Sequence, residues 1–212
     1  MRPIDGVLFD LDGTLVDSEK FHLEAWNALV VRAGHVPGDH WNLDCVGLPD
    51  TCTGEKALRL FPGIDKFGDP VAEKRTIFRE ILSREGRGLI FPGVEERLER
   101  LVAAGFRLAI GTNSPRGNTL ATLDAAGLRR FFPEIVTLDS VARGKPAPDI
   151  YASAASRLDL DPERCAVIED SPAGVLSGLA AGCFVLAVMT TWSADRLPGA
   201  ESHYATTAAA MD

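Results

Sequence analysis

Short apolar runs recur along the chain and alternate, over its second half, with stretches patterned as amphipathic helices. Runs that are apolar at nearly every position are typical of strands buried on both faces of a sheet. The sequence predicts strands at Val7–Asp10, Leu108–Thr112, Ile135–Thr137, Ala166–Glu169 and Phe184–Val188. It predicts helices at Val94–Ala103, Arg116–Ala126, Pro148–Leu158 and Pro172–Ala181. This alternation predicts an α/β fold, a parallel sheet with helices on both faces.

The stretch between the first two strands breaks this alternation and carries only helical patterns. We expect helices at Glu19–Ala33, Cys52–Leu60 and Val71–Arg84, an all-helical insert in an otherwise α/β chain. The predicted division is a sheet-containing core of residues 1–16 and 89–212 and a helical insert of residues 17–88. The joints fall at Leu15–Asp17 and Glu85–Gly88, where two glycines suit either a hinge or a plain loop. The alanine-rich end from Ala205 onward is expected to fray.

Composition is ordinary for a globular protein, with 46% hydrophobic and 25% charged residues. A net charge of −8 makes nucleic acid and an anionic membrane surface unfavourable partners, and we predict neither. The four cysteines show no Cys-x-x-Cys spacing, so we expect reduced thiols rather than a zinc or disulfide framework. The sequence shows no signal-peptide pattern and no apolar run of membrane-spanning length, and we expect a cytoplasmic protein. Nothing in it indicates an oligomeric state.

The candidate chemistry begins at the end of the first predicted strand. Asp10 and Asp12 follow an apolar run, and Gly13 breaks the strand directly after them. Open α/β sheets bind ligands at the carboxyl ends of their strands. Two carboxylates this close repel each other unless a cation or a shared proton compensates, and Mg²⁺ is the natural cation for oxygen ligands. An Asp-x-Asp pair on its own is more typical of a strand end followed by a solvated turn.

Three further motifs strengthen the catalytic interpretation. Residues 109–114 form an apolar run that ends in Thr112, Asn113 and Ser114; residues 143–149 hold Lys145 in a proline-rich loop; and residues 166–171 are a strand that ends in paired acids. With Asp10 and Asp12, these motifs resemble the haloacid dehalogenase superfamily, in particular its subgroup of β-phosphoglucomutase and small sugar-phosphate phosphatases. The resemblance covers nearly the whole chain. It implies a Rossmann-like core with the helical insert as a cap domain.

The resemblance also assigns roles to individual residues. Asp10 would be the nucleophile that forms an aspartyl-phosphate, and Asp12 would protonate the leaving group and then deprotonate the attacking water. Lys145 would neutralise the clustered carboxylates and the transferring phosphoryl group. Mg²⁺ would be held by the Asp10 side chain, the backbone carbonyl of Asp12 and Asp170. Glu169 either binds the ion directly, acts through a water molecule, or orients Asp170.

Candidate substrate contacts follow from the same motifs. Thr112 and the backbone amides of Asn113 and Ser114 would donate hydrogen bonds to phosphate oxygens. Arg116 either reaches a substrate hydroxyl or second phosphate, or belongs to the helix surface. Ser18 and His22 lie four positions apart, on one helix face, and match cleft-lining positions of the subgroup.

The substrate expected from these residues is a small phosphorylated metabolite. Mutase-like relatives need cations in the cap loop, where this chain has Val46 and Asp50. We therefore expect hydrolysis of a phosphomonoester, with a sugar or polyol phosphate as the favoured class. A β-phosphoglucomutase-like mutase is the alternative. A binding protein with a decayed site is a third reading, which the intact set of acidic residues and Lys145 disfavours.

Overall fold

The centre of the protein is a six-stranded sheet in the order β3-β2-β1-β4-β5-β6, in which every neighbouring pair is parallel. The computed structural model describes residues 3–39, 41–45 and 50–212. The strands are β1 (Gly6–Phe9), β2 (Arg107–Gly111), β3 (Glu134–Val136), β4 (Cys165–Glu169), β5 (Phe184–Val188) and β6 (Ser202–Tyr204). In the centre, Phe9 lies beside Ile110 on β2 and Ile168 on β4. The polar residues that follow these strands therefore meet at one edge of the sheet.

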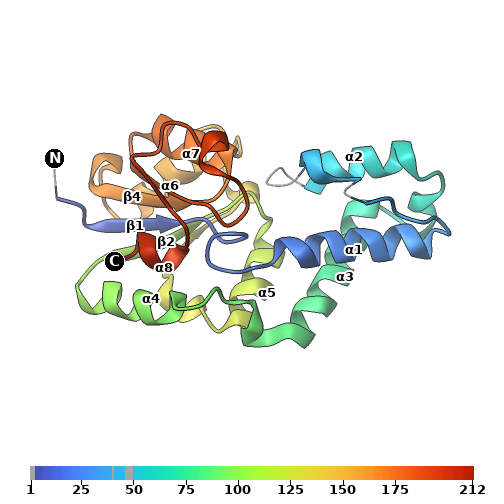
Figure 1. The fold of residues 1–212 in the computed structure, drawn as a ribbon, viewed down its shortest axis with the longest axis horizontal. Helices are drawn as coiled ribbons and strands as arrows, with labels where there is room; N and C mark the ends of the chain where they lie inside the picture. The colour runs from blue at the N-terminus through green and yellow to red at the C-terminus, as the bar shows by residue number, and fades with distance from the viewer. Residues whose placement is uncertain (1–2, 40, 46–49) are drawn as a thin grey trace.

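Helices cover both faces of this sheet, as predicted (Figure 1). They are α1 (Glu19–Arg32), α2 (Asp50–Leu60), α3 (Pro70–Glu85), α4 (Val94–Ala103), α5 (Arg116–Ala126), α6 (Asp149–Arg157), α7 (Pro172–Ala181) and α8 (Thr207–Ala210). Successive residues of β1 point to opposite faces. Leu8 shares a buried cluster with Ile150 of α6 and Val175 of α7, whereas Phe9 shares one with Leu123 of α5. The two hydrophobic cores thus lie on either side of the sheet.

The helices α1, α2 and α3 form a helical lobe that extends away from the sheet (Figure 1). It has a hydrophobic core of its own, made of Trp26, Leu29, Val30, Trp41, Ala57, Phe61 and Ile64. The two chain segments that enter and leave the lobe run side by side. Val16 and Ile90 form an antiparallel bridge, and the Asp17 amide donates to the Leu89 carbonyl at 2.8 Å. The lobe is therefore attached by this pair of hydrogen-bonded segments and by the packing of α3 against α5, where Arg79 donates to the Asn118 side chain at 3.3 Å.

The end of the chain differs from the sequence-based expectation. The three-residue strand β6 joins the edge of the sheet, and its alternating exposed and half-buried residues carry too little apolar pattern to predict a strand. The expectation that the chain frays from Ala205 onward is wrong, because α8 forms there and Ala210 is buried. The Thr207 hydroxyl also donates to the Thr14 carbonyl at 2.5 Å. These contacts tie the end of the chain to the turn that follows β1.

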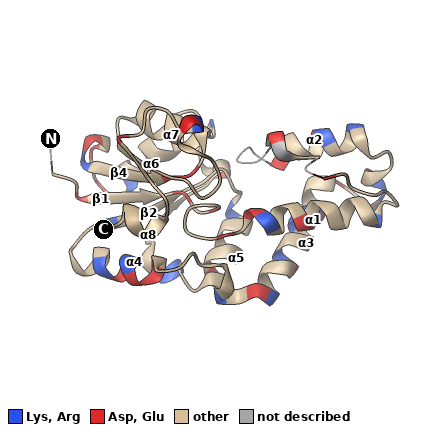
Figure 2. Cartoon of the chain, in the orientation of Figure 1, with Lys and Arg blue, Asp and Glu red and all other residues tan. Residues whose placement is uncertain are grey.

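Charged side chains of both signs are spread over the sheet region and the helical lobe (Figure 2). Several basic residues on the outer helices pair with carboxylates, such as Arg100 with Glu96 on α4 and Arg130 with Glu95. Among the described helices, none has both the length and the apolar character needed to cross a membrane.

Candidate active site

A cleft with a volume of about 250 Å³ lies between the carboxyl ends of the central strands and the helical lobe. From the sheet region it is lined by Asp10, Asp12, Thr112, Asn113, Ser114, Pro115, Lys145, Asp170, Ser171, Thr191 and Trp192. From the opposite side it is lined by Glu19, Lys20, His22, Leu23, Trp26, Asn42, Cys45, Asp50 and Thr53. The sheet thus supplies most of the residues predicted for the chemistry, and the lobe supplies a polar wall facing them.

Lys145 lies at the centre of the sheet side of this cleft. Its Nζ is 2.5 Å from Oδ1 of Asp10 and 2.5 Å from Oε1 of Glu169, and its side chain is 3% exposed. A buried ammonium is stable only when it is paired and hydrogen-bonded. Lys145 therefore joins the acid that ends β4 to the acid that follows β1.

Glu169 is completely buried, and both of its carboxylate oxygens already accept hydrogen bonds. Its Oε1 accepts from Lys145 and, at 2.9 Å, from the Tyr151 hydroxyl. Its Oε2 accepts from the Asp170 amide, the Ser171 amide and the Ser171 hydroxyl, each at 3.0 Å. A carboxylate has about four acceptor positions. The five donors therefore occupy its whole acceptor capacity.

Two glycines make room for the acidic side chains. A Cβ atom on Gly174 would lie 1.7 Å from Oε1 of Glu169, and one on Gly13 would lie 2.2 Å from Oδ2 of Asp170. Gly13 also has a φ of +82°, a conformation that residues with a side chain rarely adopt. The Asp-x-Asp-Gly sequence after β1 and the glycine in the first turn of α7 are therefore requirements of the site's packing.

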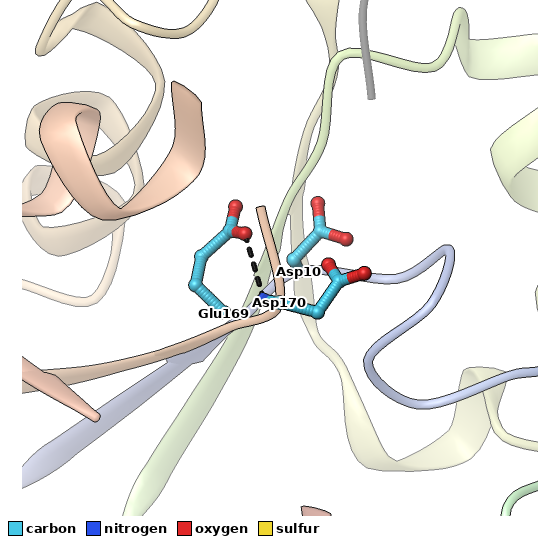
Figure 3. A group of neighbouring side chains, drawn as sticks. All are labelled: Asp10, Glu169 and Asp170. Atoms are coloured by element: carbon cyan, nitrogen blue, oxygen red, sulfur yellow. Dashed lines mark hydrogen bonds between the residues drawn. The ribbon is translucent and has the colours of Figure 1, made fainter. Parts of the chain in front are cut away.

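Asp10, Glu169 and Asp170 form a cluster whose potential ligand atoms all lie within 4.8 Å of one another. Figure 3 shows the Asp10 and Asp170 carboxylates next to each other, with the Glu169 carboxylate to one side. Asp170 is 2% exposed and accepts a hydrogen bond from the Thr14 hydroxyl at 3.2 Å. Buried carboxylates this close, with a single ammonium among them, match the hard oxygen donors that Mg²⁺ prefers.

The acidity of these groups reflects the crowding. Burial raises the pKa of Asp10 to about 8; Lys145 opposes this shift, whereas Glu169 and Asp12 add to it. Burial, followed by the charges of Glu169 and Asp10, raises the pKa of Asp170 well above its usual value. Burial also acts to lower the pKa of Lys145, but Asp10 and Glu169 outweigh it and the net shift is upward. The site therefore holds more negative charge than Lys145 alone compensates.

Asp12 lies in a different environment, although only one residue separates it from Asp10. Its Oδ1 accepts from the Ser18 hydroxyl at 2.5 Å and its Oδ2 from the Ser114 hydroxyl at 2.7 Å. The His22 Nε2 is 3.7 Å from Oδ1. Burial acts to raise the pKa of Asp12, but His22 and the two hydroxyls prevail and lower it to about 2. The carboxylate thus faces the cleft and the helical lobe.

The turn after β2 holds the lysine loop in place. The Asn113 side chain accepts from the Lys145 amide at 2.9 Å and donates to the Lys145 carbonyl at 3.3 Å. The Ser114 amide, expected to reach the phosphate, instead donates to the Thr112 hydroxyl at 3.0 Å. The turn thus closes on itself, and the contact of that amide with phosphate stays a prediction. The side chains of Asn113 and Ser114 fix Lys145 and Asp12.

A cluster of charged residues in the helical lobe was not predicted. Lys74 of α3 is fully buried, and its Nζ lies 2.6 Å from Oδ1 of Asp50 and 2.6 Å from Nδ1 of His22. Arg75 donates to the other oxygen of Asp50 at 3.1 Å. Two cations therefore neutralise Asp50, which stands where mutase-like relatives were expected to carry cations. The only signal in the sequence was a lysine within an amphipathic helix, a pattern typical of a solvent-facing residue.

The remaining candidate substrate-contacting residues lie in different places relative to the cleft. Ser18 lies behind the cleft wall, with no exposed surface, and donates a hydrogen bond to Asp12. Arg116 is exposed and is not among the residues that line the cleft; its amide donates to Asp139. Val46 of the cap loop lies outside the described residues.

Comparison with known proteins agrees with this geometry. The family model described as a haloacid dehalogenase-like hydrolase matches residues 4–182. Hexitol phosphatase A of Escherichia coli is 40% identical over 194 residues, which cover 91% of this chain and 86% of that protein. A phosphorylated carbohydrates phosphatase of Thermotoga maritima is 32% identical over 184 residues, covering 84% of this chain and 82% of that one.

One solved structure has a similar fold over nearly the whole chain. The crystal structure of a CbbY mutant from Rhodobacter sphaeroides in complex with xylulose 1,5-bisphosphate has a TM-score of 0.82 and 27% identity. The match covers 99% of each chain. Residues 4–182, which the family model matches, include all four sequence motifs and the two carboxylates beside Lys145, those of Asp10 and Glu169. The chain therefore belongs to the haloacid dehalogenase-like hydrolase family.

Proposed function

We propose that this protein is a phosphatase that hydrolyses a small phosphomonoester, a sugar or polyol phosphate, through an aspartyl-phosphate on Asp10. The observation that carries the proposal is the different environment of two aspartates in one turn. Asp10 lies in a buried acidic cluster beside Lys145, whereas Asp12 faces the cleft and is held by hydroxyl groups. Different environments give neighbouring carboxyl groups different chemical roles.

In the proposed reaction, Asp10 attacks phosphorus and the ester oxygen leaves toward Asp12. The Lys145 ammonium, 2.5 Å from Oδ1 of Asp10, stabilises the negative charge on the transferring phosphoryl group. Asp12 faces the cleft on the side of the helical lobe; it takes up the proton that a monoanionic phosphate ester carries and passes it to the leaving alkoxide. It then removes a proton from the water that hydrolyses the aspartyl-phosphate.

The acidic cluster fits a divalent cation, and we propose Mg²⁺. Asp10, Asp170 and the backbone carbonyl of Asp12 would hold the ion, which would offset their charge and polarise the phosphoryl oxygens. Glu169 supports this set from behind, because its acceptor positions are taken by Lys145, Tyr151 and backbone amides. Among the three roles open to Glu169, the hydrogen bonds favour the orienting one.

The wall opposite the chemistry suits the hydroxyl groups of a sugar or polyol. Lys74 and Arg75 are paired with Asp50, and Lys20, which also lines this wall, is paired with Asp17. The other cleft-lining groups on that side include Glu19, Asn42 and Thr53. Carboxylate, amide and hydroxyl groups bind substrate hydroxyls and give a second phosphate little positive charge. The names of the hexitol and carbohydrate phosphatase relatives point to the same class.

We further propose that residues 17–88 act as a cap over the sheet-containing core of residues 1–16 and 89–212. The helical lobe supplies one wall of the cleft and is connected to the sheet through the paired segments at Val16 and Ile90 and through the packing of α3 against α5. His22 and Ser18 then bring cap and core together through Asp12.

The test is phosphate release from a panel of phosphorylated sugars and polyols, assayed with and without Mg²⁺. The panel includes a ketose bisphosphate, because the CbbY structure holds one. We expect hexitol and sugar monophosphates to be the best substrates, and Asp10→Asn to abolish turnover. Absence of Mg²⁺-dependent phosphate release across the panel would overturn the proposal.

A further inference from the structure

We infer that Tyr151 is a positioning residue for the reaction, holding Glu169 and Lys145 in the geometry that aims the ammonium at Asp10. This inference rests on the proposed function, because the ammonium acts on the transferring phosphoryl group. Tyr151 belongs to α6, six residues after Lys145, and it is not among the residues that line the cleft. It therefore acts through the other two side chains.

The Tyr151 hydroxyl donates a hydrogen bond to Glu169 that a phenylalanine at this position could not make. The side chain is completely buried, and its surroundings on this face of the sheet include Leu8, Ala109 and Ile150. A hydroxyl in such a place is unfavourable unless it is hydrogen-bonded, and a phenylalanine would fill the same space without that requirement. The hydroxyl lies 2.9 Å from Oε1 of Glu169.

The same oxygen of Glu169 receives the ammonium of Lys145 at 2.5 Å. With both donors in place, Oε1 has no acceptor position left, and the two amides and one hydroxyl on Oε2 fix the other end of the carboxylate. Without the Tyr151 hydroxyl, the carboxylate would gain a free acceptor position beside a buried ammonium. The hydroxyl thus keeps Glu169 in one orientation.

The aromatic ring of Tyr151 holds Lys145 from a third direction. The Lys145 Nζ is 4.7 Å from the centre of the ring, a distance typical of a cation–π contact. Asp10 and Glu169 take two sides of the ammonium and the ring takes another. An ammonium is a point charge on a flexible stem, so its direction depends on such surroundings.

The position of the ring is set by the backbone of β2. A Cβ atom on Gly111 would lie 2.9 Å from Cε1 of Tyr151 and 2.9 Å from Cγ2 of Ile150. A side chain at position 111 would therefore push the ring toward Lys145 and Glu169. Gly111 leaves room for the ring directly below the turn that begins with Thr112. This packing gives a second way to disturb Tyr151 without removing its hydroxyl.

The experiment compares Tyr151→Phe and Gly111→Ala with the wild type, using Tyr204→Phe as the matched control on the other tyrosine of the chain. Rates are measured on an aryl phosphate with saturating Mg²⁺, and the folded fraction is measured by circular dichroism. We expect Tyr151→Phe to lower kcat about tenfold with KM within about twofold, which corresponds to one lost hydrogen bond to a charged group. Gly111→Ala should lower kcat in the same sense, and Tyr204→Phe should leave kcat unchanged.

A readout without turnover separates this inference from the proposed function. The ammonium protons of Lys145, followed by ¹⁵N NMR, should exchange with water faster in Tyr151→Phe than in the wild type. An active wild type whose kcat and Lys145 exchange rate are unchanged in Tyr151→Phe would overturn the positioning role alone. A fall in kcat explained wholly by a smaller folded fraction would overturn it as well. A wild type without phosphatase activity would instead overturn the proposed function, whatever the NMR result.

Discussion

Replacing Asp10 with asparagine should stabilise the metal-free protein, although it removes the proposed nucleophile. Asp10, Glu169 and Asp170 lie within 4.8 Å of one another, and Lys145 supplies the only ammonium that the described contacts show among them. Asparagine keeps the shape of the side chain and removes one of the crowded negative charges. The matched substitution Asp12→Asn should have the opposite effect, because the Asp12 carboxylate accepts two hydroxyl hydrogen bonds and lies near His22.

The magnitude follows from the pKa values of the two aspartates. Burial raises the pKa of Asp10 from 3.8 to about 8, so folding at pH 7.5 requires uptake of a proton that the unfolded chain lacks. That cost is roughly (7.5 − 3.8) × 1.36, or about 5 kcal/mol, and it approaches zero as the pH falls to the unfolded pKa. We expect a gain of roughly 2–5 kcal/mol for Asp10→Asn, since asparagine loses a hydrogen bond to a charged group.

The pKa shift of Asp12 changes the free energy of unfolding in the opposite direction. Its pKa is lowered from 3.8 to about 2, although its burial acts in the other direction. A lowered carboxyl pKa contributes stability that is fully present above the unfolded pKa and is lost as the pH falls toward the folded one. The shift corresponds to about 2 kcal/mol, which Asp12→Asn should forfeit at neutral pH.

The assay is urea denaturation followed by circular dichroism, in chelator, at pH 5.5 and pH 8. The advantage of Asp10→Asn should fall by about half between pH 8 and pH 5.5, and saturating Mg²⁺ should reduce it at pH 8 because the ion stabilises the wild type. Asp12→Asn should be less stable than the wild type at both pH values. An Asp10→Asn protein less stable than the wild type at pH 8 in chelator would refute the reasoning, as would an advantage that does not change with pH.

Three further predictions concern the cation, the proton and the cap. Chelation should abolish phosphate release, and Ca²⁺ should support little turnover because its larger coordination shell misplaces the phosphoryl group; a steady-state assay with each ion tests this. Asp12→Asn should retain part of its rate on substrates with good leaving groups and little on sugar phosphates, as a comparison of aryl and alkyl phosphates will show. Lys74→Met should lower the free energy of unfolding by about 3 kcal/mol, because the Asp50 carboxylate, which is 12% exposed, loses its closest partner; urea denaturation measures the loss, with Lys20→Met on α1 as an exposed control.

The sheet and its helices could be predicted because local signals agree with the fold. The bounds expected for Val94–Ala103, Arg116–Ala126 and Pro172–Ala181 are those observed. Proline at the first position of α7, and glycines with positive φ after α5 and α7, are strong end signals. The meeting of Asp10, Lys145 and Asp170 in space could be predicted for a related reason, since parallel strands bring their carboxyl ends to one edge.

Contacts between distant segments could not be predicted in the same way. Lys74 meets His22 across 52 positions of sequence, and its helix has the ordinary charge pattern of an exposed helix. Ser114 reaches Asp12 across 102 positions, and Tyr151 is one apolar-facing residue among several on α6. Periodicity reports which face of a helix is buried, but the partner on that face depends on how the helices pack.

Charge is distributed differently over the two walls of the cleft: the sheet side carries excess negative charge, and the charges of Lys74, Arg75 and Asp50 on the lobe side are paired. Next to the scissile bond, carboxylates outnumber the single ammonium of Lys145, so phosphate is repelled until a cation is bound. Opposite the chemistry, Lys74 and Arg75 are paired with Asp50, so the cap adds little positive charge for a second phosphate. Cation and phosphoryl group should therefore each favour binding of the other, whereas the proposed cap should distinguish substrates through hydroxyl contacts. In the proposed mechanism, catalytic charge and substrate recognition lie on opposite walls of the cleft, so substitutions on the wall formed by the helical lobe should alter substrate preference without altering the phosphoryl chemistry.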